Sequence, residues 1–192
     1  VFYAVGMYAD LTYSLNHILT FGAGLQLKNL FSGVMPLQMF LNPVLRLDYR
    51  PLPEHQIHLS IQKLHQAHHL LLQNSYGLSS DFWLPVTTVL PAEQMWQLAL
   101  EYHCQIGQNI DYQLSSFFRK AYNMAAFINP GDQYDPVLDR GLILPVFTDS
   151  GEWEEKVVAH EAFSYGLEQE LSLKWEQFSL ITAYSFGKTV YQ

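Results

Sequence analysis

Apolar and polar side chains alternate at every second position over most of the chain. The same split recurs at residues 19–28, 39–49, 57–62, 110–115 and 164–173. It is clearest at six even-numbered positions, Trp96, Leu98, Leu100, Tyr102, Cys104 and Ile106. Because successive side chains of a β-strand point to opposite faces, this period predicts strands with one apolar and one polar face.

The alternation predicts an all-β fold, an antiparallel meander of about eight long strands. Their expected ranges are 1–15, 17–28, 37–50, 55–69, 94–106, 109–127, 161–174 and 177–191. A globular strand usually has about 5–6 residues, whereas a tilted strand that crosses a bilayer needs about 9–11. Residues 64–73 and 91–101 also favour a helix by composition, which stays open as an alternative there. For 94–106 the unbroken alternation favours the strand.

The connections between these strands alternate between short and long. The short ones are 15–17, 51–54, 107–109 and 175–176, and the long ones are 29–36, 70–93 and 128–160. One rim of the sheet is therefore expected to carry tight turns and the other rim long loops. That asymmetry is typical of outer-membrane β-barrels.

Composition narrows the choice of protein class. Charged residues make up 15% of the 192 residues, hydrophobic residues 49% and aromatic residues 15%, against about 25% charged residues in ordinary soluble domains. The net charge is −8 and Lys and Arg do not cluster, which argues against a nucleic-acid partner. One cysteine, Cys104, excludes an internal disulfide framework and a thiolate zinc site. Two classes remain, a transmembrane β-barrel and a large soluble β-domain.

Several short stretches carry a family resemblance. Residues 77–87 read GLSSDFWLPVT and residues 90–100 read LPAEQMWQLAL; further stretches are IQKLHQAHHLL at 61–71, FFRKAYNM at 117–124, FSYGLE at 163–168 and LITAYSFGKT at 180–189. In this order and spacing they resemble the β-barrel of TonB-dependent outer-membrane receptors of the Bacteroidetes type. The resemblance covers roughly residues 55–192.

The resemblance implies that residues 1–192 form a single domain, a partial β-barrel truncated at both ends and lacking the plug. The full protein would be an active transporter in the cell outer membrane for a scarce, bulky nutrient of the siderophore, cobalamin or glycan class, energised by TonB. Its partners would be outer-membrane lipid, the missing strands and plug of the same protein, TonB through the missing N-terminal part, and a surface lipoprotein.

Six residues are candidates to face the ligand, because they lie in the family's loop motif, among crowded histidines, or on the polar side of a strand. They are His65, His69, Asp81, Trp83, Glu168 and Glu170. Four aromatic residues near strand ends are expected at the membrane interface, where such barrels carry aromatic girdles: Tyr13, Tyr49, Trp96 and Trp175.

The sequence contains no catalytic constellation, so we expect no enzyme activity and no cofactor. The spacing His65-x-x-His68-His69 could suggest a metal site. In one continuous strand, however, His65 and His69 would face one way and His68 the other, which disfavours chelation. No metal is therefore expected.

Two alternative functions stay open. A complete eight-stranded outer-membrane barrel acting as an anchor or adhesin predicts that the first and last strands pair. A soluble carbohydrate-binding β-domain predicts a dry core between two sheets.

Overall fold

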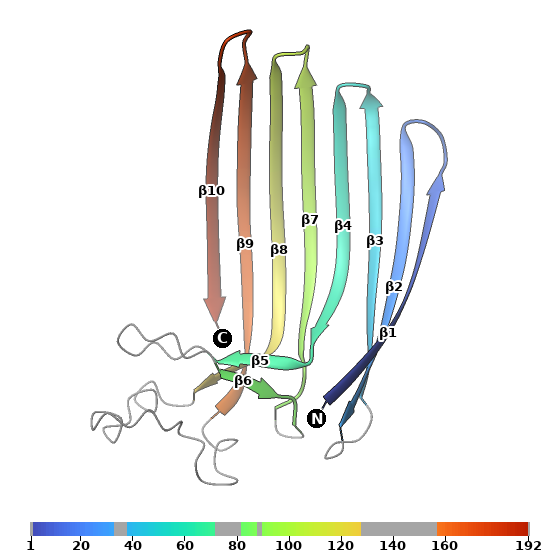
Figure 1. Ribbon diagram of the computed structural model, residues 1–192, viewed down its shortest axis with the longest axis vertical. Coiled ribbons are helices and arrows are strands. Elements are labelled where there is room, and N and C mark those ends of the chain that lie inside the picture. Colours follow the sequence, from blue (N-terminus) through green and yellow to red (C-terminus); the bar gives the residue numbers. More distant parts are fainter. Residues whose placement is uncertain (1, 33–37, 72–81, 88–89, 128–156, 192) are drawn as a thin grey trace, which may run out of the picture. The chain divides into compact units, whose positions relative to one another are not determined.

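A computed structural model describes residues 2–32, 38–71, 82–87, 90–127 and 157–191. All regular elements in these ranges are strands (Figure 1), which confirms the all-β prediction. Their bounds are β1 Phe2–Ser14, β2 Leu19–Ser32, β3 Gln38–Leu52, β4 His55–Gln66, β5 His68–Leu71, β6 Phe82–Pro85, β7 Glu93–Ile106, β8 Ile110–Phe127, β9 Val157–Lys174 and β10 Ser179–Tyr191.

Eight of the strands form one sheet in the order β1-β2-β3-β4-β7-β8-β9-β10, and β5 pairs with β6 in a separate two-stranded sheet. The long strands follow one another as an antiparallel meander (Figure 1), as predicted. Where a helix remained possible at 91–101, the structure has the strand β7. Alternating apolar side chains gain a common face in a strand, and this outweighs the helix-favouring composition of that segment.

The predicted strand 55–69 is wrong in one respect, because the chain leaves the sheet after Gln66. The Gln66 amide Nε2 donates a hydrogen bond to the carbonyl oxygen of His68, 2.8 Å away. This bond satisfies a backbone group locally instead of in the ladder, and Ala67 between the two residues is buried. The residues after it pair with β6, in the register His69 opposite Leu84.

Four connections between neighbouring long strands are short, as predicted: those after β1, β3, β7 and β9. At the first, the Asn16 side-chain oxygen accepts hydrogen bonds from the backbone N–H groups of Ile18 and Leu19, at 2.9 and 2.8 Å. At the third, Gly107 has a φ of +62°, in the left-handed region that favours glycine. The predicted long connections are partly wrong, because 29–32 belong to β2, 157–160 belong to β9, and β5 and β6 occupy part of 70–93. Their remaining residues lie mostly outside the described ranges.

The chain divides into two compact units. The first comprises Val1–His65, Met95–Lys120 and Phe163–Val190, and the second comprises Gln66–Gln94, Ala121–Ala162 and Tyr191–Gln192. The first unit contains most of the long strands. The second contains β5, β6 and the remaining ends of the long strands.

Candidate functional site

The apolar face of the first unit is exposed and is bounded by aromatic residues. Tyr13 lies opposite Phe21 and Tyr3 lies opposite Phe31. Tyr3 and Tyr13 are 67% and 61% exposed. Their separation of ten positions corresponds to about 34 Å along a strand. At the usual barrel tilt this corresponds to a height of about 24–28 Å, close to the apolar band of an outer-membrane barrel.

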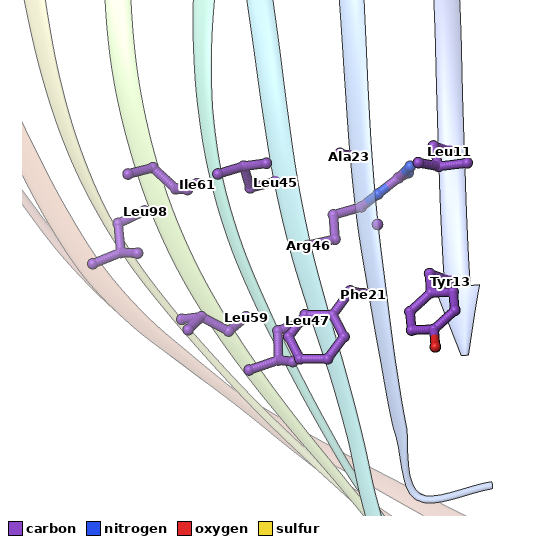
Figure 2. Close-up of a pocket in the computed structure, with 11 residues that line it drawn as sticks. Leu11, Tyr13, Phe21, Ala23, Leu45, Arg46, Leu47, Leu59, Ile61 and Leu98 are labelled. Carbon is purple, nitrogen blue, oxygen red and sulfur yellow. The ribbon is translucent and has the colours of Figure 1, made fainter. Parts of the chain in front are cut away.

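Two cross-strand rows of apolar residues line a shallow depression on this face (Figure 2). Its volume is about 390 Å³. The strand registers align one row as Tyr13, Phe21, Leu47 and Leu59, and the other as Leu11, Ala23, Leu45 and Ile61. Leu11 and Leu45 are 69% and 57% exposed. Large apolar side chains in such numbers normally form a core or an interface.

The opposite face of the same strands is polar and is held together by hydrogen bonds. Asp10 forms an ion pair with Arg46, and the Tyr8 hydroxyl donates to the same carboxylate at 2.8 Å. Between them lie Gly22, where a Cβ would press on the Arg46 side chain at 3.0 Å, and Gly24, where a Cβ would collide with Asp10 at 2.8 Å. The glycines therefore make room for charged groups of neighbouring strands to meet across β2.

His65 also lies on this polar face. Its Nδ1 atom is 2.6 Å from the side-chain oxygen of Asn42, whose amide in turn donates to Gln26 at 3.0 Å. Its ring stacks on Phe40, with 5.2 Å between ring centroids. Strict alternation from Ile61 would place His65 on the apolar face. The side-chain alternation of β4 therefore shifts by one residue between Ile61 and His65, and we call this shift the slip.

Two histidine–carboxylate pairs lie on the polar face nearer the tight turns. His58 Nδ1 is 2.8 Å from Asp48 Oδ1, and His103 Nε2 is 2.9 Å from Asp111 Oδ2. Both histidines line a small hollow of about 130 Å³ together with Glu101. The face thus carries alternating donors and acceptors that suit contact with water or a polar solute.

Glu168 and Glu170 line a third hollow, of about 390 Å³. Its other lining residues include Gln113 and Ser115 of β8, Gln169 of β9 and Ser185 of β10. Both glutamates are exposed. That Glu168 and Glu170 meet a ligand stays a prediction.

In the second unit, His69 is fully buried. Its Nδ1 atom is 3.1 Å from Glu93 Oε1, and its Nε2 atom has no hydrogen-bond partner within the described part of the chain. A ligand-facing role for His69 stays a prediction. Trp83 lies in β6 with its backbone opposite Leu70, and Asp81 falls outside the described residues.

The remaining predicted interface aromatics are half-exposed. Tyr49, Trp96 and Trp175 have 40%, 42% and 46% of their surface exposed. Trp175 stacks on Phe178 in the last tight turn, with 4.5 Å between ring centroids, and Lys63 Nζ lies 5.8 Å from the Trp96 ring. Their role at a membrane interface stays a prediction.

Sequence reasoning missed several residues that organise the two faces. Tyr3 repeats the aromatic signal of Tyr13 ten residues earlier and could have been found from that spacing. The Asp10–Arg46 pair could not, because it depends on the register of three strands. The same holds for Arg119, whose Nε donates to Gln97 at 2.9 Å.

Over the residues that the structure describes, no three His, Cys, Asp or Glu side chains gather in a way that could hold a metal ion. None of the described residues belongs to a helix long and apolar enough to cross a membrane.

No protein-family model and no curated protein matches the chain. Solved structures do match. One is the FrpB iron transporter from Neisseria meningitidis, with a TM-score of 0.66 and 11% identity over 98% of this chain. Two others have TM-scores of 0.61 and 12% identity over the same share: the FpvAI–pyocin S2 complex, and the ferripyoverdine receptor of the Pseudomonas aeruginosa outer membrane bound to ferripyoverdine.

The chain spans about a quarter of the structures that it matches, 26% of the first and 23% of each of the other two. At these identities the comparison concerns the fold. It agrees with the resemblance seen in the sequence. The chain has the fold of part of a TonB-dependent outer-membrane receptor barrel.

Proposed function

We propose that this chain is part of the wall of an outer-membrane transporter, with its apolar face against lipid and its polar face along the transport passage. The observation that carries the proposal is the exposure of large apolar side chains on one face of the first unit. Alternate large apolar side chains such as Leu11 and Leu45 are exposed, while the opposite face holds the Asp10–Arg46 pair. A bilayer supplies the missing apolar contact, and the aromatic-bounded height matches its thickness.

Neither alternative function fits the described sheet. A closed eight-stranded barrel requires β1 to pair with β10, but within the described residues these strands stand at opposite ends of the strand order. A soluble sandwich requires a second layer over the apolar face, and the exposed residues of β1–β3 have none in the described part of the first unit.

The cargo that we propose is a bulky, scarce nutrient, with an iron(III)–siderophore chelate first among the candidates. The support is that two of the similar structures are named as an iron transporter and a ferripyoverdine receptor. TonB energisation and partnership with a plug, further strands of the same protein and a surface lipoprotein belong to the same proposal. Residues 1–192 then form one part of a larger barrel domain.

Cysteine labelling tests the placement of the two faces. In the full-length protein with Cys104→Ser, the variant Ser115→Cys places a thiol on the polar face and Leu98→Cys places one on the apolar face. A charged maleimide should label the Ser115→Cys variant in intact outer membranes, and an apolar maleimide should label the Leu98→Cys variant. Equal labelling of both by the charged reagent would refute the proposed membrane placement.

Uptake measurements test the transport function. Cells that produce the full-length protein should accumulate radioactive iron supplied as ferripyoverdine or another siderophore chelate, and a strain without TonB should not. Uptake that is the same with and without the protein, for siderophore, cobalamin and glycan substrates alike, would reject the transporter.

A further inference from the structure

The Arg119 side chain on β8 is held by two residues of the same unit, one on β7 and one on β8. Its Nε atom donates a hydrogen bond to Gln97 Oε1 of β7 at 2.9 Å. Its guanidinium carbon lies 4.2 Å from the centre of the Phe117 ring, within the range of a cation–π contact. These two contacts restrict the plane and direction of a side chain that would otherwise sample many rotamers.

Gly166 on β9 allows this arrangement. A Cβ atom at position 166 would lie 2.6 Å from Phe117 Cε1 and 2.7 Å from Phe117 Cζ, closer than carbon atoms can approach. The ring therefore lies directly against the backbone of β9 because that residue has no side chain. Phe117 in this position provides the surface over which the guanidinium of Arg119 lies.

The hydrogen-bonding capacity of Arg119 is only partly used. Within the described residues, Arg119 makes its polar contact through Nε, and neither Nη group has a hydrogen-bond or ion-pair partner there. Arg46 on the same face differs, because Asp10 neutralises it. A guanidinium with a fixed plane and two free NH2 groups, Nη1 and Nη2, matches the geometry of a carboxylate or phosphate group.

We propose that Arg119 is a binding site for an oxyanion group, carboxylate or phosphate, of a solute on the polar face, prearranged by Gln97, Phe117 and Gly166. The inference rests on the proposed function, which opens this face to an aqueous passage. Arg119 supplies the charge and the two donors, Gln97 fixes their direction, and Gly166 acts only through the position of Phe117.

Chemical modification of the full-length protein in detergent micelles tests the site. Phenylglyoxal modifies accessible arginines, and peptide mass spectrometry reports each position separately. Sodium acetate and inorganic phosphate, in separate arms, are compared with sodium chloride at equal ionic strength. We expect one or both oxyanions to slow the modification of Arg119 about threefold or more, with no change at the exposed Arg50. The arm that protects identifies the oxyanion.

Two glycine variants provide a matched pair. Gly166→Ala should abolish the protection by displacing Phe117. Gly187→Ala should keep it, because a Cβ there would lie 3.9 Å from the nearest atom outside its own neighbours, the carbonyl oxygen of Tyr165. Because the Cβ added by Gly166→Ala would also lie 2.9 Å from the backbone carbonyl oxygen of Phe186, Phe117→Leu is made beside that variant, with the same expectation.

Three results would overturn the inference or its premise, and they differ. Modification of Arg119 at the same rate in acetate, phosphate and chloride rejects the oxyanion site while leaving the proposed function intact. Undiminished protection in the variant lacking the Phe117 contact rejects the prearrangement. Failure to modify Arg119 while Arg50 reacts shows that water does not reach the polar face at Arg119, and rejects the aqueous passage that the proposed function places along it.

Discussion

The two faces of the first unit share one backbone but are organised by opposite rules. On the polar face, side chains of different strands bond to one another, as Asp10 does to Arg46 and Asn42 does to Gln26 and His65. On the apolar face, residues such as Leu11 and Met39 are 69% and 68% exposed. One face is specified by pairwise contacts within the protein and the other by the medium around it.

This difference indicates which substitutions should change the stability of the protein. Polar-face positions depend on particular neighbours, so their size and chemistry are constrained one by one. Apolar-face positions depend on a shared property, hydrophobicity, so one aliphatic residue can replace another there. The following changes to the full-length protein test that distinction.

A charge on the apolar face should have the largest effect. Leu45→Arg places a guanidinium in the middle of the exposed apolar rows, and this should lower the free energy of unfolding in phospholipid vesicles by about 2–4 kcal/mol. Gln62→Arg, on the polar face of the neighbouring strand, should cost much less. Denaturant titration monitored by tryptophan fluorescence compares them. Equal and small effects would mean that the two faces meet the same solvent.

A methyl group added to the polar face should have the next largest effect. A Cβ at Gly24 would lie 2.7 Å from Val44 Cγ1 and 2.8 Å from Asp10 Oδ2, so Gly24→Ala should destabilise by about 1–3 kcal/mol through overpacking. Gly6→Ala is the control, because its Cβ would lie 3.8 Å from the nearest such atom. The same titration applies, and indistinguishable variants would contradict the close packing across β2.

The smallest effect should come from the ion pair. The Asp10 and Arg46 side chains are 25% and 33% exposed, so solvent screens their attraction. A double-mutant cycle with Asp10→Asn and Arg46→Gln should give a coupling of about 0.2–1 kcal/mol. Additive effects of the two substitutions would show that the pair contributes nothing to the polar face.

The sequence predicts the long strands well because the apolar and polar faces of each strand appear as alternation within its own sequence. Alternation over 94–106 needs no knowledge of the partner strands, and β7 runs from Glu93 to Ile106. The tight turns are equally local, as Gly107 and the hydrogen bonds of Asn16 illustrate. Short-range chemistry therefore fixes the meander.

The candidate site is less predictable because it depends on register and on breaks in the pattern. His65 lies beside Asn42 only because the alternation slips after Ile61, and the departure of the chain at Gln66 separates His69 from the same strand. The close approach of Phe117 to Gly166 joins residues 49 positions apart in sequence. No local sequence pattern predicts such contacts.

The slip between Ile61 and His65 has a consequence for how such a sheet can change over evolution. Where residues 44–49 of β3 pair with residues 57–62 of β4 in unbroken register, inserting or deleting one amino acid would turn apolar side chains toward water and polar side chains toward lipid. Beyond the slip, the side chains of β4 have already exchanged faces once, and the strand still continues to Gln66. Length variation among descendants of this protein should therefore accumulate on the far side of Ile61 and be rare within residues 44–49 and 57–61.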